Sequence, residues 1–301
     1  MYKIKVPATS ANLGSGFDSL GLALSMYNYV EMDFCDRLTI ESADDIKVPT
    51  DETTLIYKTA KYLFDVKGKK LDGLYIRQTN NIPMARGLGS SSACIVAGLV
   101  GANALLGNEF SKDEIVDFAA KLEGHPDNST PALLGGVVTA VIDEEKVYHI
   151  KHDLKDDLQF TAIIPDFELE TKVARSVIPM EISHKDAVFN LSRCALMATS
   201  LSEGRYENIK VACKDKLHQP YRINLIKNAD DIFKSAYKNG AYGAFISGAG
   251  STLMAISNAD NKDFVANMQK TLDSFSLSGW KIVNLKADNL GVTIEKTKNN
   301  I

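Results

Sequence analysis

Cysteine is scarce in this chain of 301 residues, with four scattered copies and no Cys-x-x-Cys pair. A zinc ribbon needs two such pairs, and a disulfide-stapled scaffold needs a denser set of cysteines, so both classes are excluded. Widely spaced single cysteines are typical of a protein in a reducing compartment, and we therefore expect a cytoplasmic location.

Long apolar runs and an excess of basic residues are also missing. The most apolar stretch, residues 93–106, is too short to span a bilayer, and the N-terminus lacks the apolar core of a secretory signal. Lys and Arg number 34 against 38 Asp and Glu, which gives a net charge of −4. A nucleic-acid binder usually carries a basic excess or stripe. We therefore expect no membrane and no nucleic-acid partner.

The remaining composition is that of an ordinary globular protein, with 45% hydrophobic and 24% charged residues. No long Pro-, Gly- or Ser-rich linker and no repeat interrupts the chain. Strands and helices are both predicted in the first half, helical patterns dominate residues 185–239, and strands return after residue 240. This order predicts an α+β protein with two domains, residues 1–155 and residues 156–301.

The segment Pro83-Met-Ala-Arg-Gly-Leu-Gly-Ser-Ser-Ser-Ala93 carries the strongest chemical signal. Its two glycines let backbone amides approach a ligand, and a buried helix is predicted over residues 93–106. Backbone amides at a helix N-terminus form an anion site suited to phosphate, and serine hydroxyls can ligate a phosphate-bound Mg²⁺. The alternative is a Gly/Ser loop that only caps a buried helix. The segment is neither a Walker A motif nor a dinucleotide fingerprint.

Two other glycine-containing segments adjoin predicted strands. Residues 7–21 follow the first strand and place Asn12 and Asp18, which can hold a hydroxyl or an amine, among turn-forming glycines. Residues 247–252, Ser-Gly-Ala-Gly-Ser-Thr, lie between two predicted strands. Each segment taken alone is equally an ordinary loop or a hairpin turn, so neither assigns a function by itself.

A further polar segment, Glu123-Gly-His-Pro-Asp-Asn128, stands at the end of a predicted helix. Glu123 can hold Mg²⁺, which prefers one or two carboxylates together with substrate phosphates. Asp127 is a candidate general base. The alternatives are that Asp127 or Asn128 caps the next helix and that His125 is an ordinary surface histidine.

Taken together, these segments resemble the GHMP kinase superfamily and, within it, the homoserine kinase branch. The segment PMARGLGSSSA is similar to the superfamily motif P-x-x-x-G-L-G-S-S-x-A, and SGAGST is similar to its C-terminal glycine motif. One departure is Ser129-Thr130, where the branch commonly has Val-Ala. The segments that resemble the homoserine branch are VPATSANLGSGFDSLGLAL, HPDN followed by PALLGG, TKVAR and HQPYR.

The resemblance implies a fold and an activity. Residues 1–155 would form an ATP-binding domain like ribosomal protein S5 domain 2, and residues 156–301 a ferredoxin-like domain. The implied enzyme is an ATP:L-homoserine O-phosphotransferase of threonine biosynthesis, which uses ATP and Mg²⁺ and forms a homodimer. The alternatives are a mevalonate-type kinase of the same superfamily, an inactive relative that acts as a sensor, and a nucleotide-binding module without chemistry.

The resemblance also assigns ligand contacts. Mg²⁺ would be held by Ser91 and Glu123, with Ser90 as the alternative hydroxyl. The residues implied to bind the ATP phosphates are Pro83, Arg86, Gly87, Leu88, Gly89, Ser90, Ser91, Ser92 and Ala93. The residues implied to bind the amino acid are Asn12, Asp18, His125, Thr171, Arg175, Arg222 and Gly248.

Particular roles follow for three of these positions and for Asp127 and Asn128. Arg175 and Arg222 suit the carboxylate of homoserine, because a guanidinium binds a carboxylate bidentately, and Asp18 suits its ammonium. Asn128 is expected to orient the attacking hydroxyl. Asp127 is expected to be structural, because a loose phosphoryl-transfer transition state depends more on positioning than on proton removal.

Overall fold

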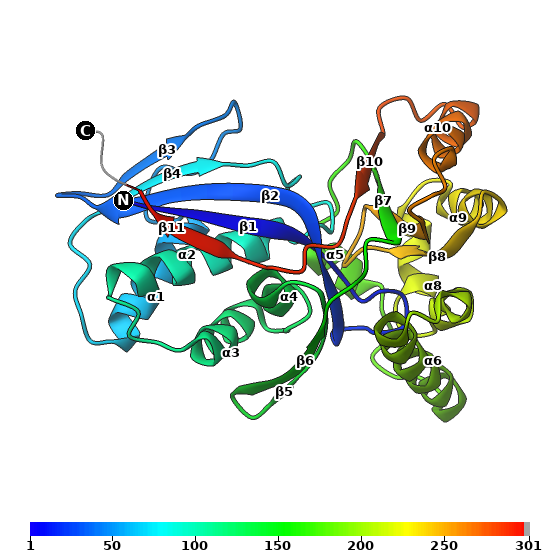
Figure 1. Ribbon diagram of the computed structural model, residues 1–301, viewed down its shortest axis with the longest axis horizontal. Coiled ribbons are helices and arrows are strands. Elements are labelled where there is room, and N and C mark those ends of the chain that lie inside the picture. The colour runs from blue at the N-terminus through cyan, green and yellow to red at the C-terminus, as the bar shows by residue number, and fades with distance from the viewer. Residues whose placement is uncertain (298–301) are drawn as a thin grey trace.

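The computed structural model describes residues 1–297 and contains two sheets, one in each half of the molecule (Figure 1). The first sheet runs β11-β1-β2-β4-β3, and β5 extends it by pairing with β2 and β6. In β1, Ile4, Val6 and Ala8 are fully buried. The strands of the first sheet are β1 (Tyr2–Ala11), β2 (Leu20–Phe34), β3 (Thr39–Ser42), β4 (Leu74–Thr79), β5 (Val137–Asp143), β6 (Lys146–His152) and β11 (Thr293–Lys296).

Four helices cover one face of the first sheet (Figure 1). The central helix, α2, packs closely on its neighbours because its glycines leave room: a Cβ at Gly98 would overlap Thr59, and one at Gly101 would overlap Met32. The position of α2 confirms the buried helix that was predicted after the Gly/Ser loop, residues 83–92. These helices are α1 (Leu55–Val66), α2 (Ser90–Leu105), α3 (Lys112–Glu123) and α4 (Ser129–Leu134).

The sequence predicts a capping box of Ser111 and Glu114 at one helix start and Asp51 as the N-cap of another helix, and the two predictions have different outcomes. The capping box of Ser111 and Glu114 is present at the start of α3, with both reciprocal hydrogen bonds. Asp51, by contrast, is not the N-cap of α1, because Thr54 holds that position. The Asp51 carboxylate instead accepts hydrogen bonds from the backbone and hydroxyl of Thr53. The Asp51 side chain therefore stabilises the turn before α1 and does not cap the helix.

The second sheet has four antiparallel strands in the order β10-β7-β9-β8. Counted within this half, the order is 4-1-3-2, which is the ferredoxin-like arrangement, with α9 and α10 as its helices. The predicted α+β organisation is confirmed. The elements of this half are β7 (Leu158–Ile164), α5 (Thr171–Ser176), α6 (His184–Glu203), η1 (Tyr206–Asn208), α7 (Ile209–Ala212), α8 (Gln219–Arg222), η2 (Ile223–Leu225), α9 (Ala229–Lys238), β8 (Ala241–Ile246), β9 (Leu253–Asn258), α10 (Phe264–Ser274) and β10 (Lys281–Leu285).

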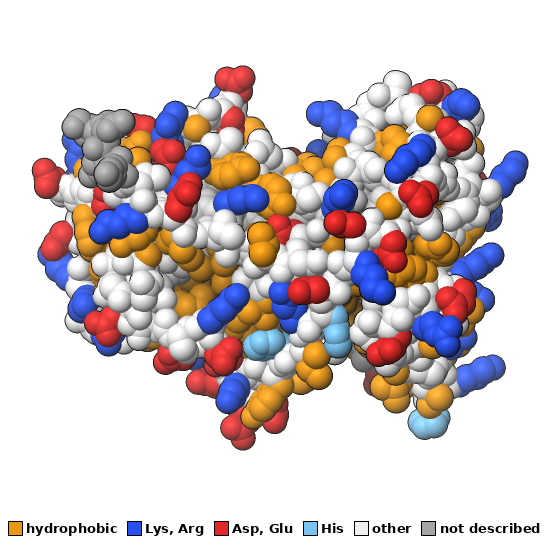
Figure 2. Space-filling model, in the orientation of Figure 1, with side chains coloured by type: hydrophobic (Ala, Val, Ile, Leu, Met, Phe, Trp, Pro, Cys, Tyr) orange, Lys and Arg blue, Asp and Glu red, His pale blue; other side chains and the backbone are white. Residues whose placement is uncertain are grey.

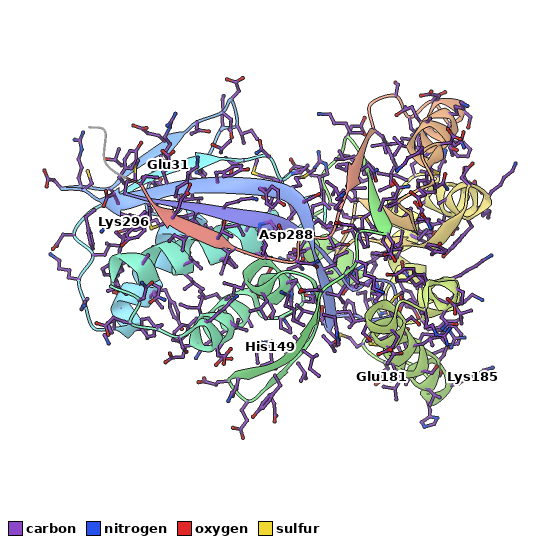
Figure 3. All side chains as sticks on the ribbon, viewed as in Figure 1. Glu31, His149, Glu181, Lys185, Asp288 and Lys296 are labelled. Carbon is purple, nitrogen blue, oxygen red and sulfur yellow. The ribbon has the colours of Figure 1, made fainter. Side chains whose placement is uncertain are left out.

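The last described strand returns to the first sheet. β11 pairs antiparallel with β1, and Ala287 bridges to Leu24 on the way. Asp288 lies where this segment crosses between the halves (Figure 3), and its carboxylate accepts hydrogen bonds from the Tyr27 hydroxyl and from two backbone amides. Residues 293–296, expected in the second domain, therefore lie at the edge of the first sheet. The boundary near residue 155 stays a prediction.

The surface charges, the hydropathy of the helices and the state of the cysteines can each be compared with the composition. On the face shown in Figure 2, basic and acidic side chains are interspersed and no basic stripe crosses the surface. Among residues 1–297, no helix combines the length and apolar character that a membrane crossing requires. All four cysteines are free thiols.

Candidate active site

A cavity of about 360 Å³ is lined by residues of both halves, among them residues of α5, the helix that Figure 1 shows at the junction of the halves. It is lined by the loop after β1, the loop before α2, the segment between α3 and α4, and the β8–β9 loop, together with α5 and α8. Most of the predicted site residues therefore meet in one place although they are far apart in sequence. The predicted residues that line it are Asn12, Asp18, Arg86, Gly87, Gly89, Ser90, Ser91, Ser92, Glu123, His125, Asp127, Asn128, Thr171, Arg175, Arg222 and Gly248.

The N-terminus of α2 opens into this cavity. The helix begins at Ser90, and its N-cap, Gly89, has a left-handed backbone with φ of 72°. A Cβ at Gly89 would overlap the Thr9 hydroxyl, so only glycine fits there. Among residues 1–297, no side chain caps this end of the helix, which leaves first-turn amides available to an anion. The loop therefore has the geometry expected of a phosphate site.

Three loop residues predicted to contact ATP do not line the cavity. Leu88 and Ala93 are buried in the hydrophobic core, and Pro83 also lies outside the cavity lining. The carbonyl of Leu88 accepts a hydrogen bond from the backbone amide of Thr9, with a distance of 3.1 Å. The side chains of Leu88 and Ala93 thus anchor the loop to the core, and contact of these residues with ATP stays a prediction that concerns their backbone alone.

Glu123 is half-buried beside the loop before α2, and its Oε2 atom is inaccessible to solvent. Its Oε1 accepts a hydrogen bond from the hydroxyl of Ser92, whereas the Ser91 side chain is exposed. This hydrogen bond was not predicted, and the assignment of Ser91 and Glu123 as Mg²⁺ ligands stays a prediction. Oε2 has no hydrogen-bond partner among the described residues. Burial raises the pKa of Glu123 to about 7. A buried carboxylate oxygen without a donor is a natural cation ligand, so this site fits Mg²⁺.

A chain of polar contacts runs along one side of the cavity. His125 Nδ1 lies 2.6 Å from Asp127 Oδ1, and the same oxygen accepts a 3.5 Å contact from Asn128 Nδ2. The Thr9 hydroxyl donates to Asn128 Oδ1 with a distance of 2.8 Å. Burial lowers the pKa of His125, but the hydrogen bond and charge of Asp127 outweigh it, and the net shift is upward. Asp127 is thus engaged by its neighbours, which favours a structural role.

Asp18 and Arg175 form a bidentate ion pair at the other side. The two N–O distances are 3.0 and 2.8 Å, and both side chains are about one-third exposed. The hydrogen bond to Asp18 raises the pKa of Arg175. The structure thus brings together a predicted ammonium partner and a predicted carboxylate partner. A ligand that carries both charges can replace this contact with one at each residue.

Arg222 is the most informative side chain of the cavity, because it is only 1% exposed. Its guanidinium donates to the carbonyls of Ala174 and Gly248 at 3.0 and 3.1 Å and lies 3.2 Å from His218 Nδ1. Within residues 1–297, no carboxylate lies within ion-pair distance of it. Burial lowers the pKa of Arg222 to about 10. A buried cation without a counterion is expected to meet an anion supplied by a ligand.

Comparison with known proteins identifies the family. Residues 54–136 match the GHMP kinases N terminal domain, and residues 197–273 match the GHMP kinases C terminal domain. A homoserine kinase of Clostridium beijerinckii is 47% identical over 99% of this chain and 100% of its own length. One of Caldicellulosiruptor saccharolyticus is 46% identical over 98% and 96%. The chain belongs to the homoserine kinase family.

A solved structure supports the same assignment. The homoserine kinase of Cytophaga hutchinsonii superposes with a TM-score of 0.86 at 29% identity and covers 97% of this chain and 96% of its own. The two-domain GHMP kinase fold expected from the resemblance is therefore confirmed. The departure at Ser129-Thr130 lies at the start of α4, where both side chains are fully buried without a hydrogen-bond partner among the described residues.

Phe17 and His218 contribute to the site although neither was predicted to. The Phe17 ring centroid lies 5.4 Å from the Arg175 guanidinium carbon and 5.3 Å from that of Arg222. The same ring stacks on His218 at 5.1 Å. It therefore forms a shared platform for both guanidiniums. His218 stands in HQPYR, a segment that resembles the homoserine kinase branch, whereas nothing in the local pattern marks Phe17.

Asn12 lines the cavity and also links two of the loops around it. Its Nδ2 donates to the Gly248 carbonyl at 2.9 Å, and its Oδ1 accepts from the Asp18 backbone amide at 3.0 Å. Asn12 thus links the loop after β1 to the β8–β9 loop across the cavity edge. One N–H of its amide remains for a ligand.

Proposed function

We propose that this protein transfers the γ-phosphoryl group of ATP to the side-chain hydroxyl of L-homoserine, giving O-phospho-L-homoserine and ADP. The observation that carries the proposal is the buried Arg222 without a carboxylate partner, in the same cavity as the uncapped N-terminus of α2. One end of the cavity suits the carboxylate of an amino acid, and the other suits phosphates.

The phosphate end would bind ATP through the backbone amides of the first turn of α2. Glu123 would hold Mg²⁺, with a serine hydroxyl of the same turn as a second ligand; Ser91 is the expected one, and Ser90 is the alternative. Mg²⁺, when bound, neutralises charge that develops on the transferred phosphoryl group. The raised pKa of Glu123 means that the cation also stabilises the ionised carboxylate in its buried position.

The amino-acid end would hold homoserine by its two charges. Arg175 and Arg222 bind the carboxylate, and Asp18 binds the ammonium, so the Asp18–Arg175 contact is exchanged for contacts with the ligand. The Asn128 amide then lies beside the side-chain hydroxyl and orients it toward the phosphates. Asp127 keeps His125 and Asn128 in place, and no dedicated base is required in a loose transition state.

Three further residues, the location of the protein and its oligomeric state complete the proposal. His125, Thr171 and Gly248 line the amino-acid end and complete its shape. We also propose a cytoplasmic location and a homodimer, as the family resemblance implies. Light scattering coupled to gel filtration tests the dimer, and a monomer at working concentration would contradict it.

The test of the function is ADP release from Mg·ATP with a panel of acceptors. The panel contains L-homoserine, D-homoserine, L-serine, L-threonine, mevalonate and galactose. The proposal predicts strong turnover with L-homoserine alone. Turnover with mevalonate or galactose instead would contradict the assigned amino-acid end, because neither compound carries an ammonium for Asp18.

A further inference from the structure

Thr9 contacts both ends of the cavity. It lies in β1 and is fully buried. Its backbone amide donates to the Leu88 carbonyl in the phosphate loop at 3.1 Å, and its hydroxyl donates to Asn128 Oδ1 at 2.8 Å. The hydroxyl also faces Gly89, where a Cβ would overlap it. One residue therefore joins the loop expected to hold the donor phosphates to the amide expected to hold the acceptor hydroxyl.

We propose that Thr9 is a positioning residue that sets the orientation of the Asn128 amide for phosphoryl transfer. The inference rests on the proposed function. An asparagine amide has a donor end and an acceptor end, and its hydrogen bonds decide which end faces a ligand. Thr9 donates to Oδ1, and the Asp127 carboxylate, which can only accept, lies on the Nδ2 side, so an N–H of Nδ2 is left for the acceptor. Nδ2 makes only a 3.5 Å contact with Asp127, so it can donate to a substrate oxygen.

Loss of the Thr9 hydroxyl would remove the hydrogen bond that fixes the orientation of the Asn128 amide. The Asn128 amide could then rotate and change the hydrogen bond that it offers to the acceptor hydroxyl, so the acceptor oxygen would be directed less well at the phosphate. Substrate binding would change little, because the charges of homoserine are held by Asp18, Arg175 and Arg222. The effect is therefore expected in kcat rather than in KM.

The direct test replaces Thr9 with valine, which has the same shape and no hydroxyl. Thr9→Val is expected to lower kcat about 10- to 100-fold, the usual range for residues that orient a ligand-binding group. KM for ATP and L-homoserine should stay within about threefold. Thr9→Ser restores the donor and should recover most of the lost kcat. Thr9→Ala takes the place of the valine variant if valine does not fold.

A matched control is available in the second sheet. Thr161 is a fully buried strand threonine whose hydroxyl contacts Asn284 Oδ1 at 3.4 Å, and it does not line the cavity. Thr161→Val removes a comparable side chain to side chain hydrogen bond and should leave kcat unchanged. Melting temperatures of both valine variants show whether any loss of activity follows from lost stability.

A double-mutant cycle separates positioning from a general structural effect. If Thr9 acts through Asn128, adding Thr9→Val to Asn128→Ala should cause no further loss of kcat. Multiplied losses, or a Thr9→Val enzyme as fast as the unaltered protein, would overturn the inference and leave the proposed function intact. Failure of the unaltered protein to phosphorylate L-homoserine would overturn the proposed function and this inference with it.

Discussion

The two ends of the cavity are built in different ways. The phosphate end comes mainly from one continuous segment, the loop before α2 and its first turn, and it presents backbone amides. The amino-acid end comes from separate segments after β1, in α5, in α8 and in the β8–β9 loop, and it presents charged side chains. A backbone site suits a ligand that many enzymes share, whereas a side-chain site can be specific for one amino acid.

This difference explains why the ends were predictable to different degrees. The phosphate end could be predicted from one short segment, because glycines and serines at the start of a buried helix are recognisable in the local sequence. The amino-acid end depends on residues more than 200 positions apart, such as Asn12 and Gly248. Only the resemblance to a family could place those residues together. The substitutions below test whether the two ends can be disturbed independently.

The largest effect is expected at the phosphate end from Glu123→Gln. Loss of the carboxylate removes the charge that would hold Mg²⁺, and we expect kcat to fall about 100- to 1000-fold, as for other removed electrostatic groups. Steady-state rates over a Mg²⁺ titration measure this. Glu109→Gln, at a surface pair with Lys67, is the control and should leave the rates unchanged. Full activity of Glu123→Gln at low Mg²⁺ would contradict the assigned ligand.

Arg222→Met tests the amino-acid end. Removing one partner of a buried charge pair typically costs several kcal/mol, so KM for L-homoserine should rise about 100-fold while KM for ATP stays constant. The free protein should keep or gain stability, because a buried unpaired cation is replaced by an apolar side chain. Arg193→Met, at a side chain that contacts Phe189 outside the cavity, is the control. An equal rise in both KM values would contradict the division into two ends.

Asp127→Asn is expected to have a smaller effect. The substituted amide keeps an oxygen that can accept hydrogen bonds from its neighbours, and a loose transition state needs no base, so kcat should fall less than about tenfold. Single-turnover rates at saturating substrates measure the chemical step. A loss of several orders of magnitude, with folding and Mg·ATP binding intact, would make Asp127 the general base instead.

The smallest effect concerns stability and pH. The folded protein holds the Glu123 proton more tightly than the unfolded chain, because its pKa is raised from 4.5 to about 7. The free energy of unfolding should therefore fall as the pH rises through this window. Without Mg²⁺, the melting temperature should fall more between pH 5 and pH 8 for the unaltered protein than for the Glu123→Gln variant. Identical losses would contradict the buried, unpaired carboxylate.

Most strands and helices could be predicted from the sequence because their apolar patterns are local. The four exposed residues of β11 carry no burial pattern that indicates which sheet this strand joins. The hydrogen bond from Ser92 to Glu123 was not predicted, because the direction of each serine side chain depends on where α2 begins. Leu88 was predicted among the ATP contacts, although its apolar side chain packs in the core.

The roles of Thr9 and Phe17 could not be predicted from the sequence. Each is an ordinary residue for its position, one in a strand and one in a glycine-rich loop. Their contacts with Asn128 and with the two arginines exist only once distant segments have folded together. No spacing along the chain could indicate them.

The central claim is that one cavity holds the amino acid by its charged end and offers its hydroxyl to the phosphates. Nuclear magnetic resonance of the product made from Mg·ATP and L-homoserine tests this most directly. The account predicts a phosphate ester whose phosphorus couples to the protons of the side-chain CH₂ next to oxygen. Phosphate on the carboxylate, or no phosphorylated amino acid at all, would contradict it.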